Sequence, residues 1–124
     1  MSDLYQQVLL EELANPQNKK VMEDADVSSH AVNASCGDDM TVFLKLNGNV
    51  ITEVSWVGSG CAISQATMSL LSEEVKGKTV ADVHTISQRD LEQLIGLEEK
   101  ISVGRIKCLM LGLGAVKGCL IYIK

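Results

Sequence analysis

The sequence predicts an α+β fold in which a small antiparallel sheet packs against several helices. A hairpin is expected at Asn47-Gly48-Asn49, because asparagine and glycine adopt positive φ at low cost and β-branched residues flank them. Segments with helical periodicity lie before and after this hairpin. Strands that follow one another directly, with the helices grouped after them, favour α+β over a parallel sheet of alternating strands and helices.

The composition is that of a folded globular protein. The chain has 124 residues, of which 46% are hydrophobic and 22% charged, and this length suits a single domain over residues 1–124. The net charge is −5 and only 3% of the residues are aromatic. Because nucleic acids are bound by basic grooves or aromatic stacking surfaces, we expect no nucleic-acid partner.

The first expected helix covers residues 2–14. Ser2 or Asp3 can cap it, and Pro16 ends it, because the residue before a proline disfavours helical geometry. Four aliphatic side chains at helical spacing are expected to form its buried stripe: Leu4, Val8, Leu9 and Leu13. Residues 17–30 are polar and carry both signs of charge, and we expect a surface loop there.

Three short strands are expected next, at 30–34, 40–46 and 50–57. The third alternates β-branched with other residues, as half-buried strands do. Together the three segments predict an antiparallel meander.

The rest of the chain is expected to be helical. A buried helix follows Cys61 and ends near Gly77, which lysines flank. The pairs Thr79/Asp82 and Ser87/Asp90 have the spacing of a capping box, with Asp in place of Glu or Gln, and predict two helix starts. A last helix begins within 103–107 and carries the apolar tract 109–123, of which residues 120–123 can equally be an extended end. Glycines and a lysine interrupt this tract, and a membrane span needs about 20 apolar residues, so we expect a buried helix and no membrane partner.

The four cysteines are spaced singly. Met1-Ser2-Asp3 is polar, unlike the start of a secretory signal, so we expect a cytoplasmic protein in a compartment where structural disulfides are rare. Cys36, Cys61, Cys108 and Cys119 form no CxxC pair, which argues against a zinc ribbon or a thioredoxin-like motif.

Three of these cysteines lie at the edges of expected elements. Cys36 lies on a loop two residues before Asp38, Cys61 begins a helix after Gly-Ser-Gly, and Cys108 lies in the first turn of the last helix after two basic residues. Helix N-termini and nearby cations favour the thiolate, which is the form that attacks electrophiles and binds metals. Cys119 lies among aliphatic residues and is expected to pack in the core.

Two interpretations of these cysteines stay open at the level of residue types. Free cysteine is often a small buried hydrophobe, so all three can be core residues. If they converge with Asp38, three sulfurs and one oxygen form a donor set suited to zinc or to an iron–sulfur cluster. Glycines beside Cys36 and Cys61 favour a site, because they let the backbone approach a ligand closely.

Three cysteine motifs follow one another along the chain. They are Asn33-Ala34-Ser35-Cys36-Gly37-Asp38, then Gly60-Cys61-Ala62-Ile63-Ser64-Gln65-Ala66-Thr67-Met68-Ser69, then Arg105-Ile106-Lys107-Cys108. In this order they resemble the motifs of the U-type iron–sulfur cluster assembly scaffolds, the IscU/SufU/NifU N-terminal family. Tyr5, Asn15-Pro16-Gln17-Asn18 and Val75-Lys76-Gly77-Lys78 extend the resemblance over nearly the whole chain.

The resemblance implies a site made of Cys36, Asp38, Cys61 and Cys108, which would hold a transient [2Fe–2S] cluster or zinc. Such scaffolds take persulfide sulfur from a cysteine desulfurase and pass the cluster to acceptor apo-proteins or carrier proteins. Cys108 is our candidate persulfide acceptor, and Asp38, a hard oxygen donor among soft sulfurs, is expected to keep the cluster labile. We expect a scaffold rather than an enzyme, and we also consider a homo-oligomer.

Departures from the family pattern support an alternative. Lys107 stands where the ISC branch has a histidine, and Arg105-x-Lys107-Cys108 resembles the SufU branch, although the insertion typical of that branch is absent. The alternative is a SufU-type zinc-dependent sulfurtransferase that accepts persulfide and activates a desulfurase, which would make the protein an enzyme. Residues 101–105 lack both prolines of the family's chaperone-recognition site. His30 and His84 are not expected to bind metal.

Overall fold

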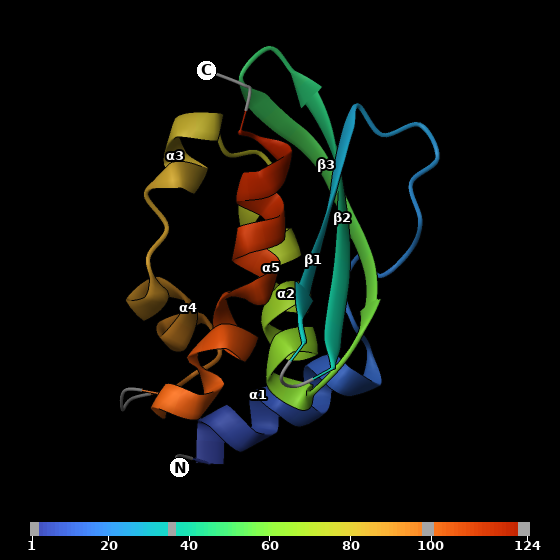
Figure 1. The fold of residues 1–124 in the computed structure, drawn as a ribbon. Coiled ribbons are helices and arrows are strands. Elements are labelled where there is room, and N and C mark those ends of the chain that lie inside the picture. The colour runs from blue at the N-terminus through green and yellow to red at the C-terminus, as the bar shows by residue number, and fades with distance from the viewer. Residues whose placement is uncertain (1–2, 35–36, 98–100, 122–124) are drawn as a thin grey trace.

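The computed structural model describes residues 3–34, 37–97 and 101–121, and it places the helices on one face of a three-stranded antiparallel sheet (Figure 1). The elements, in chain order, are α1 (Asp3–Ala14), β1 (Val27–Asn33), β2 (Asp38–Asn47), β3 (Val50–Ser59), α2 (Ala62–Val75), α3 (Val80–His84), α4 (Gln88–Leu94), the 3₁₀ turn η1 (Val103–Arg105) and α5 (Ile106–Cys119). The predicted α+β fold is confirmed. Helix α5 packs on β1 and β2, α2 packs on β3, and α1 packs on α2.

The sheet is a meander with the strand order β1-β2-β3. The predicted hairpin joins β2 to β3, with Asn47 paired to Val50 and Gly48 at a φ of 64°. A register shift between Lys45 and Leu46 marks a bulge near this turn.

The alternation of side chains in β2 determines what the sheet presents to the helices. Met40, Val42 and Leu44 are fully buried, and Val54 and Trp56 of β3 lie opposite two of them on the same face. Asp38 continues this alternation at the first position of β2 and is buried as well. The strand therefore directs a carboxylate into the interior at one end of the sheet.

The expected loop over 17–30 is wrong in its last part, because β1 begins at Val27. After Val27 its inward residues are small or polar, so the stretch lacks the apolar alternation that predicts a strand. Small size is needed where α5 passes close by: a Cβ on Gly118 would overlap Ser29 Oγ. His30, expected at the start of a strand, lies within β1.

The expected buried stripe of α1 is wrong for Leu4 and Leu13, whereas Leu9 does pack against the core. Tyr5 is only 3% exposed, whereas Leu4 is 55% exposed and Leu13 is exposed too. Helix α1 packs mainly on α2, and among its described side chains Tyr5 and Leu9 meet the core. Helical periodicity alone does not indicate which of two adjacent stripes will be covered.

The segment after α1 is held by buried polar groups of α2 and β3. The Gln17 amide donates to Ser69 Oγ at 2.6 Å, and Trp56 Nε1 donates to the Gln17 carbonyl oxygen at 2.8 Å. Asn18, at a φ of 60°, donates from its side chain to Ser72 Oγ at 2.9 Å. These bonds attach the Asn-Pro-Gln-Asn segment to the same helix that begins at Cys61.

Both predicted capping boxes are confirmed. Thr79 and Asp82 bond reciprocally at the start of α3, and Ser87 and Asp90 do so at the start of α4.

The last helix begins where it was expected, with η1 leading into α5. Helix α5 ends at Cys119, just before the residues for which an extended end was the alternative. Among the described residues, no helix is long and apolar enough to cross a membrane.

Candidate metal centre

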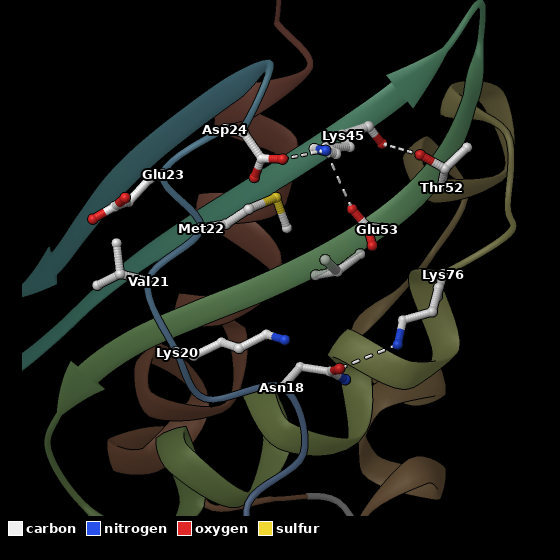
Figure 2. A pocket seen from close by; sticks show the side chains of 11 residues that line it. Asn18, Lys20, Val21, Met22, Glu23, Asp24, Lys45, Thr52, Glu53 and Lys76 are labelled. Carbon is white, nitrogen blue, oxygen red and sulfur yellow. Dashed lines mark hydrogen bonds and ion pairs between the residues drawn. The ribbon is translucent and has the colours of Figure 1, made fainter.

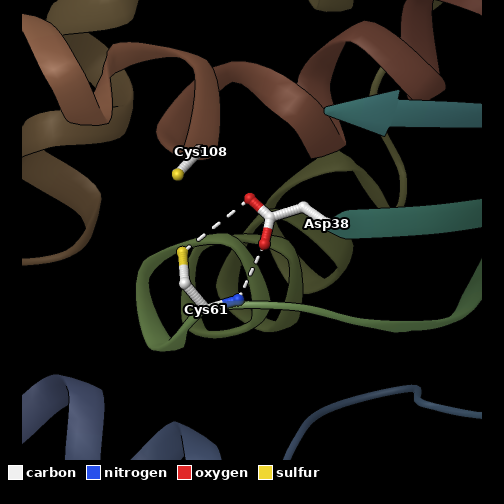
Figure 3. A group of neighbouring side chains, drawn as sticks. All are labelled: Asp38, Cys61 and Cys108. Carbon is white, nitrogen blue, oxygen red and sulfur yellow. Dashed lines mark hydrogen bonds between the residues drawn. The ribbon is translucent and has the colours of Figure 1, made fainter. Parts of the chain in front are cut away.

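Three side chains from three different elements converge beside the end of the sheet (Figure 3). Asp38 is the first residue of β2, Cys61 precedes the first turn of α2, and Cys108 lies in the first turn of α5. One carboxylate oxygen and the two sulfurs all lie within 4.8 Å of one another. The fourth predicted ligand, Cys36, lies outside the described residues.

Asp38 is fixed by the start of α2. Its Oδ1 accepts a hydrogen bond from the Cys61 amide at 2.8 Å, and its Oδ2 lies 3.9 Å from Cys61 Sγ. A carboxylate at a helix N-terminus is favoured, because the helix dipole and the unpaired amides there attract negative charge. The same carboxylate thus bonds to the helix and faces the thiols.

Gly60 makes this approach possible. It has a φ of 149°, and a Cβ at this position would overlap the Asp38 carboxylate. Gly58 has a similar role, since its Cβ would overlap the backbone oxygen of Asp39. The Gly-Ser-Gly segment that marked Cys61 in the sequence is therefore required by the packing of β3 against β2.

The two cysteines have different surroundings. Cys61 is half-buried, and its Sγ lies 3.7 Å from the hydroxyl of Ser64, which donates to the Cys61 carbonyl oxygen at 3.0 Å. Cys108 is 3% exposed, and the side-chain amide of Asn33 lies 3.9 Å from its Sγ. Asn33 is the first residue of the first cysteine motif, and its position in the sequence indicates no contact with Cys108.

The donor set fits zinc or iron. Thiolate sulfur is a preferred ligand of zinc and of iron–sulfur clusters, and a carboxylate oxygen is a common additional donor, whereas calcium and magnesium prefer oxygen alone. The described residues supply three donors, so a four-coordinate centre needs one more. Cys36 remains our prediction for that position.

Cys119 differs from these cysteines as expected. It is buried between α5 and the sheet, and its Sγ donates to the Val42 carbonyl oxygen at 3.6 Å. Burial raises the pKa of this thiol to about 12, because the interior disfavours a thiolate. Cys119 is a core residue.

The remaining polar features of the described structure do not join this site. His30 is exposed on the other face of the sheet and lies 2.8 Å from Asp39, and His84 is exposed at the end of α3. A cavity of about 740 Å³ lies between the 18–24 segment and strands β2 and β3 (Figure 2). In this cavity Lys45 pairs with Asp24 and Glu53, so the charges of these three lining residues largely neutralise one another.

A family profile described as NifU-like N-terminal domain matches residues 4–122. The chain belongs to this family. The family identification from the three cysteine motifs is thereby confirmed.

The relatives of this chain include one protein named as a zinc-dependent sulfurtransferase and others named as cluster assembly scaffolds. The chain is 32% identical over 111 residues to the zinc-dependent sulfurtransferase SufU of Bacillus subtilis strain 168, which covers 88% of this chain and 75% of that protein. It is 35% identical over 116 residues to the iron–sulfur cluster assembly scaffold protein IscU of Aquifex aeolicus, which covers 91% of this chain and 71% of that one.

A solved structure has the same fold. It is the N-terminal part of a nitrogen-fixing NifU-like protein from Brucella abortus, with a TM-score of 0.81 and 20% identity over 96% of this chain and 93% of that one. At this level of identity the likeness concerns the fold alone.

Proposed function

We propose that this protein is an iron–sulfur cluster assembly scaffold that holds a labile [2Fe–2S] cluster and passes it on. The observation that carries the proposal is the convergence of Asp38, Cys61 and Cys108 from three elements in a NifU-like chain. Core packing would explain the cysteines alone, but the Cys61 amide satisfies only one oxygen of the buried Asp38 carboxylate, and the other oxygen faces the Cys61 sulfur.

Each residue would have a ligand role that follows from its donor atom and its burial. Cys61, Cys108 and Cys36 would provide the soft ligands, and Asp38 would be the weak, exchangeable one. Cys61 is half-buried, whereas Cys108 and Asp38 are covered, so an acceptor would approach from the Cys61 side. The cluster itself is cargo that the protein receives and releases.

Sulfur would arrive from a cysteine desulfurase as a persulfide. The bound desulfurase would have to uncover Cys108, which is 3% exposed, before the Cys108 thiolate attacks the terminal sulfur of the R–S–SH group. This attack would form a Cys108–S–SH persulfide and release R–S⁻. The S–S bond of the donor breaks as the new one forms, so no external oxidant is needed. A reducing cytoplasm keeps the acceptor cysteine as a free thiol and not as a disulfide, and this is the compartment where we place the activity.

Cluster handover tests the scaffold proposal. The protein is incubated anaerobically with a desulfurase, cysteine, ferrous iron and a plant-type apo-ferredoxin, and the ferredoxin spectrum is followed. We expect the wild-type chain to accelerate cluster acquisition well above the rate without it, and Cys61→Ala to remove the acceleration. Equal rates with and without the chain would contradict the proposal.

A second candidate function is a SufU-type zinc-dependent sulfurtransferase that activates its desulfurase. Lys107 favours it, because this residue precedes Cys108, is exposed, and cannot provide the imidazole of the ISC branch. The identity to the Bacillus SufU supports it as well. In this case zinc would occupy the same donors, and an exchanged ligand would free one thiolate to accept sulfur.

Desulfurase stimulation separates the two candidates. Alanine release from cysteine is measured with the zinc-loaded and the chelator-stripped protein. Stimulation that requires zinc supports the sulfurtransferase, whereas stimulation that is indifferent to zinc excludes it. The metal content of the freshly purified protein provides an independent measure.

A further inference from the structure

A side chain outside the predicted ligand set also contacts the site. Asn33 is the last residue of β1 and is 6% exposed, and its amide nitrogen lies 3.9 Å from Cys108 Sγ. An amide NH₂ group can only donate hydrogen bonds, and a cysteine sulfur can accept them. The contact therefore has a fixed polarity, from Asn33 to the sulfur.

The register of the sheet explains why Asn33 is there. Asn33 pairs with Asp38 across β1 and β2, at the last rung before the 34–37 connection. Paired residues point to the same face of an antiparallel sheet, so both side chains face the helices. An amide and a carboxylate thus lie side by side against the first turn of α5, where Cys108 is.

The contact makes the two sulfurs of the site chemically different. Cys61 Sγ lies near the Asp38 carboxylate and the Ser64 hydroxyl, whereas Cys108 Sγ faces an amide donor. A hydrogen bond to a metal-bound thiolate withdraws electron density from the sulfur and fixes its direction, and such outer partners tune both affinity and potential.

We propose that Asn33 is a positioning residue that donates a hydrogen bond to the sulfur of Cys108 when the site holds metal. It orients this sulfur toward the other donors and weakens its electron donation relative to Cys61. The inference rests on the proposed function only in requiring that a metal binds at Asp38, Cys61 and Cys108.

Cobalt substitution tests this role directly. Co²⁺ is added anaerobically to the reduced metal-free protein, and the sulfur-to-cobalt charge-transfer bands and the cobalt affinity are measured. In Asn33→Leu, the loss of the donor raises the energy of the sulfur electrons, so we expect the charge-transfer band to shift to longer wavelength. The affinity should fall by about 10-fold to 100-fold, because the sulfur is no longer held toward the other donors, and this loss outweighs its stronger electron donation.

Three further variants make the result specific. Asn33→Gln keeps an amide and should restore part of the wild-type spectrum. His30→Leu places the same residue on β1 but on its exposed face, and it should leave the band unchanged. In a Cys108→Ser background, Asn33→Leu should no longer shift the remaining sulfur band.

The outcomes separate this inference from the proposed function. Unchanged bands in an Asn33→Leu protein that binds cobalt would overturn the role of Asn33 and leave the scaffold proposal intact. A shift that persists in the Cys108→Ser background would overturn it too, because the effect would then act through another ligand. If Asn33→Leu does not fold, Asn33→Ala removes the amide without added bulk, and the same shift of the charge-transfer band is expected for it. A wild-type protein that binds no cobalt would overturn both proposals.

Discussion

At the scale of single residues, the site depends on how closely Gly60 and Asp38 approach each other. Asp38 occupies the space that a side chain at position 60 would need, and it bonds to the amide of the next residue. The backbone conformation at Gly60 and the position of the proposed ligand Asp38 are therefore coupled. The glycine next to Cys61 indicated a close approach in the sequence, but not the group that makes it.

Gly60→Ala should weaken metal binding, because the new methyl group displaces the carboxylate. We expect zinc affinity to fall by about 10-fold to 100-fold in a competition titration with a chromophoric chelator. Gly48→Ala is the matched control, since Gly48 also has positive φ but faces open space in the hairpin. It should cost about 1 kcal/mol of stability and leave zinc affinity unchanged. Equal zinc affinities of Gly60→Ala and wild type would contradict the coupling.

Asp38→Ala should lengthen the life of a bound cluster. Removing the hard donor leaves the soft ligands, and the exchangeable position is lost. The measurement is the decay of the cluster absorbance of the reconstituted protein under a fixed oxygen exposure. Faster decay in the variant would show that Asp38 retains the cluster rather than releasing it.

The cysteines should differ in reactivity. Cys119, buried and with its pKa raised to about 12, is almost entirely a thiol at pH 8, whereas Cys61 is half-buried at a helix start. Limited treatment of the metal-free protein with iodoacetamide, followed by peptide mass analysis, should label Cys61 well before Cys119. Comparable labelling rates would contradict a core position for Cys119.

At the scale of elements, α4 holds the segment that leads into α5. The carboxylate of Glu92 is 2% exposed, and it accepts hydrogen bonds from the Ile101 amide at 2.9 Å and from Arg89 at 3.1 Å. The bond from the Ile101 amide, with smaller contributions from Arg89 and Gln88, holds the pKa of Glu92 below its ordinary value. Glu92 thus attaches α4 to the chain just before Cys108.

Glu92→Gln should destabilise the protein at neutral pH, by about 1 kcal/mol. Because the folded-state pKa is lowered, the stabilisation is complete above the unfolded-state pKa of about 4.3 and is lost as the pH falls through the folded-state value. Urea unfolding at several pH values should therefore show the variant and the wild type converging in acid. Glu73→Gln, on an exposed stretch of α2, is the control and should change little. A difference that does not depend on pH would contradict this account.

Elements with local signals were predictable, and those that depend on tertiary contacts were not. The starts of α3 and α4 follow from side chains three residues apart, so the sequence alone predicted them. The start of β1 did not follow, because Ser29 is small to fit against Gly118, far along the chain. The buried face of α1 did not follow either, since docking on α2 selects Tyr5 over Leu4.

At the scale of the whole molecule, the site exists only because the fold assembles it. Asp38, Cys61 and Cys108 lie far apart in the sequence, and residue types alone left core packing and a metal site equally open. The family motifs predicted the convergence that is now seen for these three residues, with Cys36 outside the described part of the chain. The contact from Asn33 could not be predicted, because it depends on the register between β1 and β2.

Anaerobic cluster reconstitution, compared among single-cysteine variants, tests the central claim most directly. Iron and acid-labile sulfide are quantified together with the visible absorption spectrum. We predict one [2Fe–2S] cluster per site in the wild type and in Cys119→Ala, and no stable cluster in Cys36→Ala, Cys61→Ala or Cys108→Ala. A wild-type protein without a stoichiometric cluster, or a Cys108→Ala protein with a full one, would contradict the account.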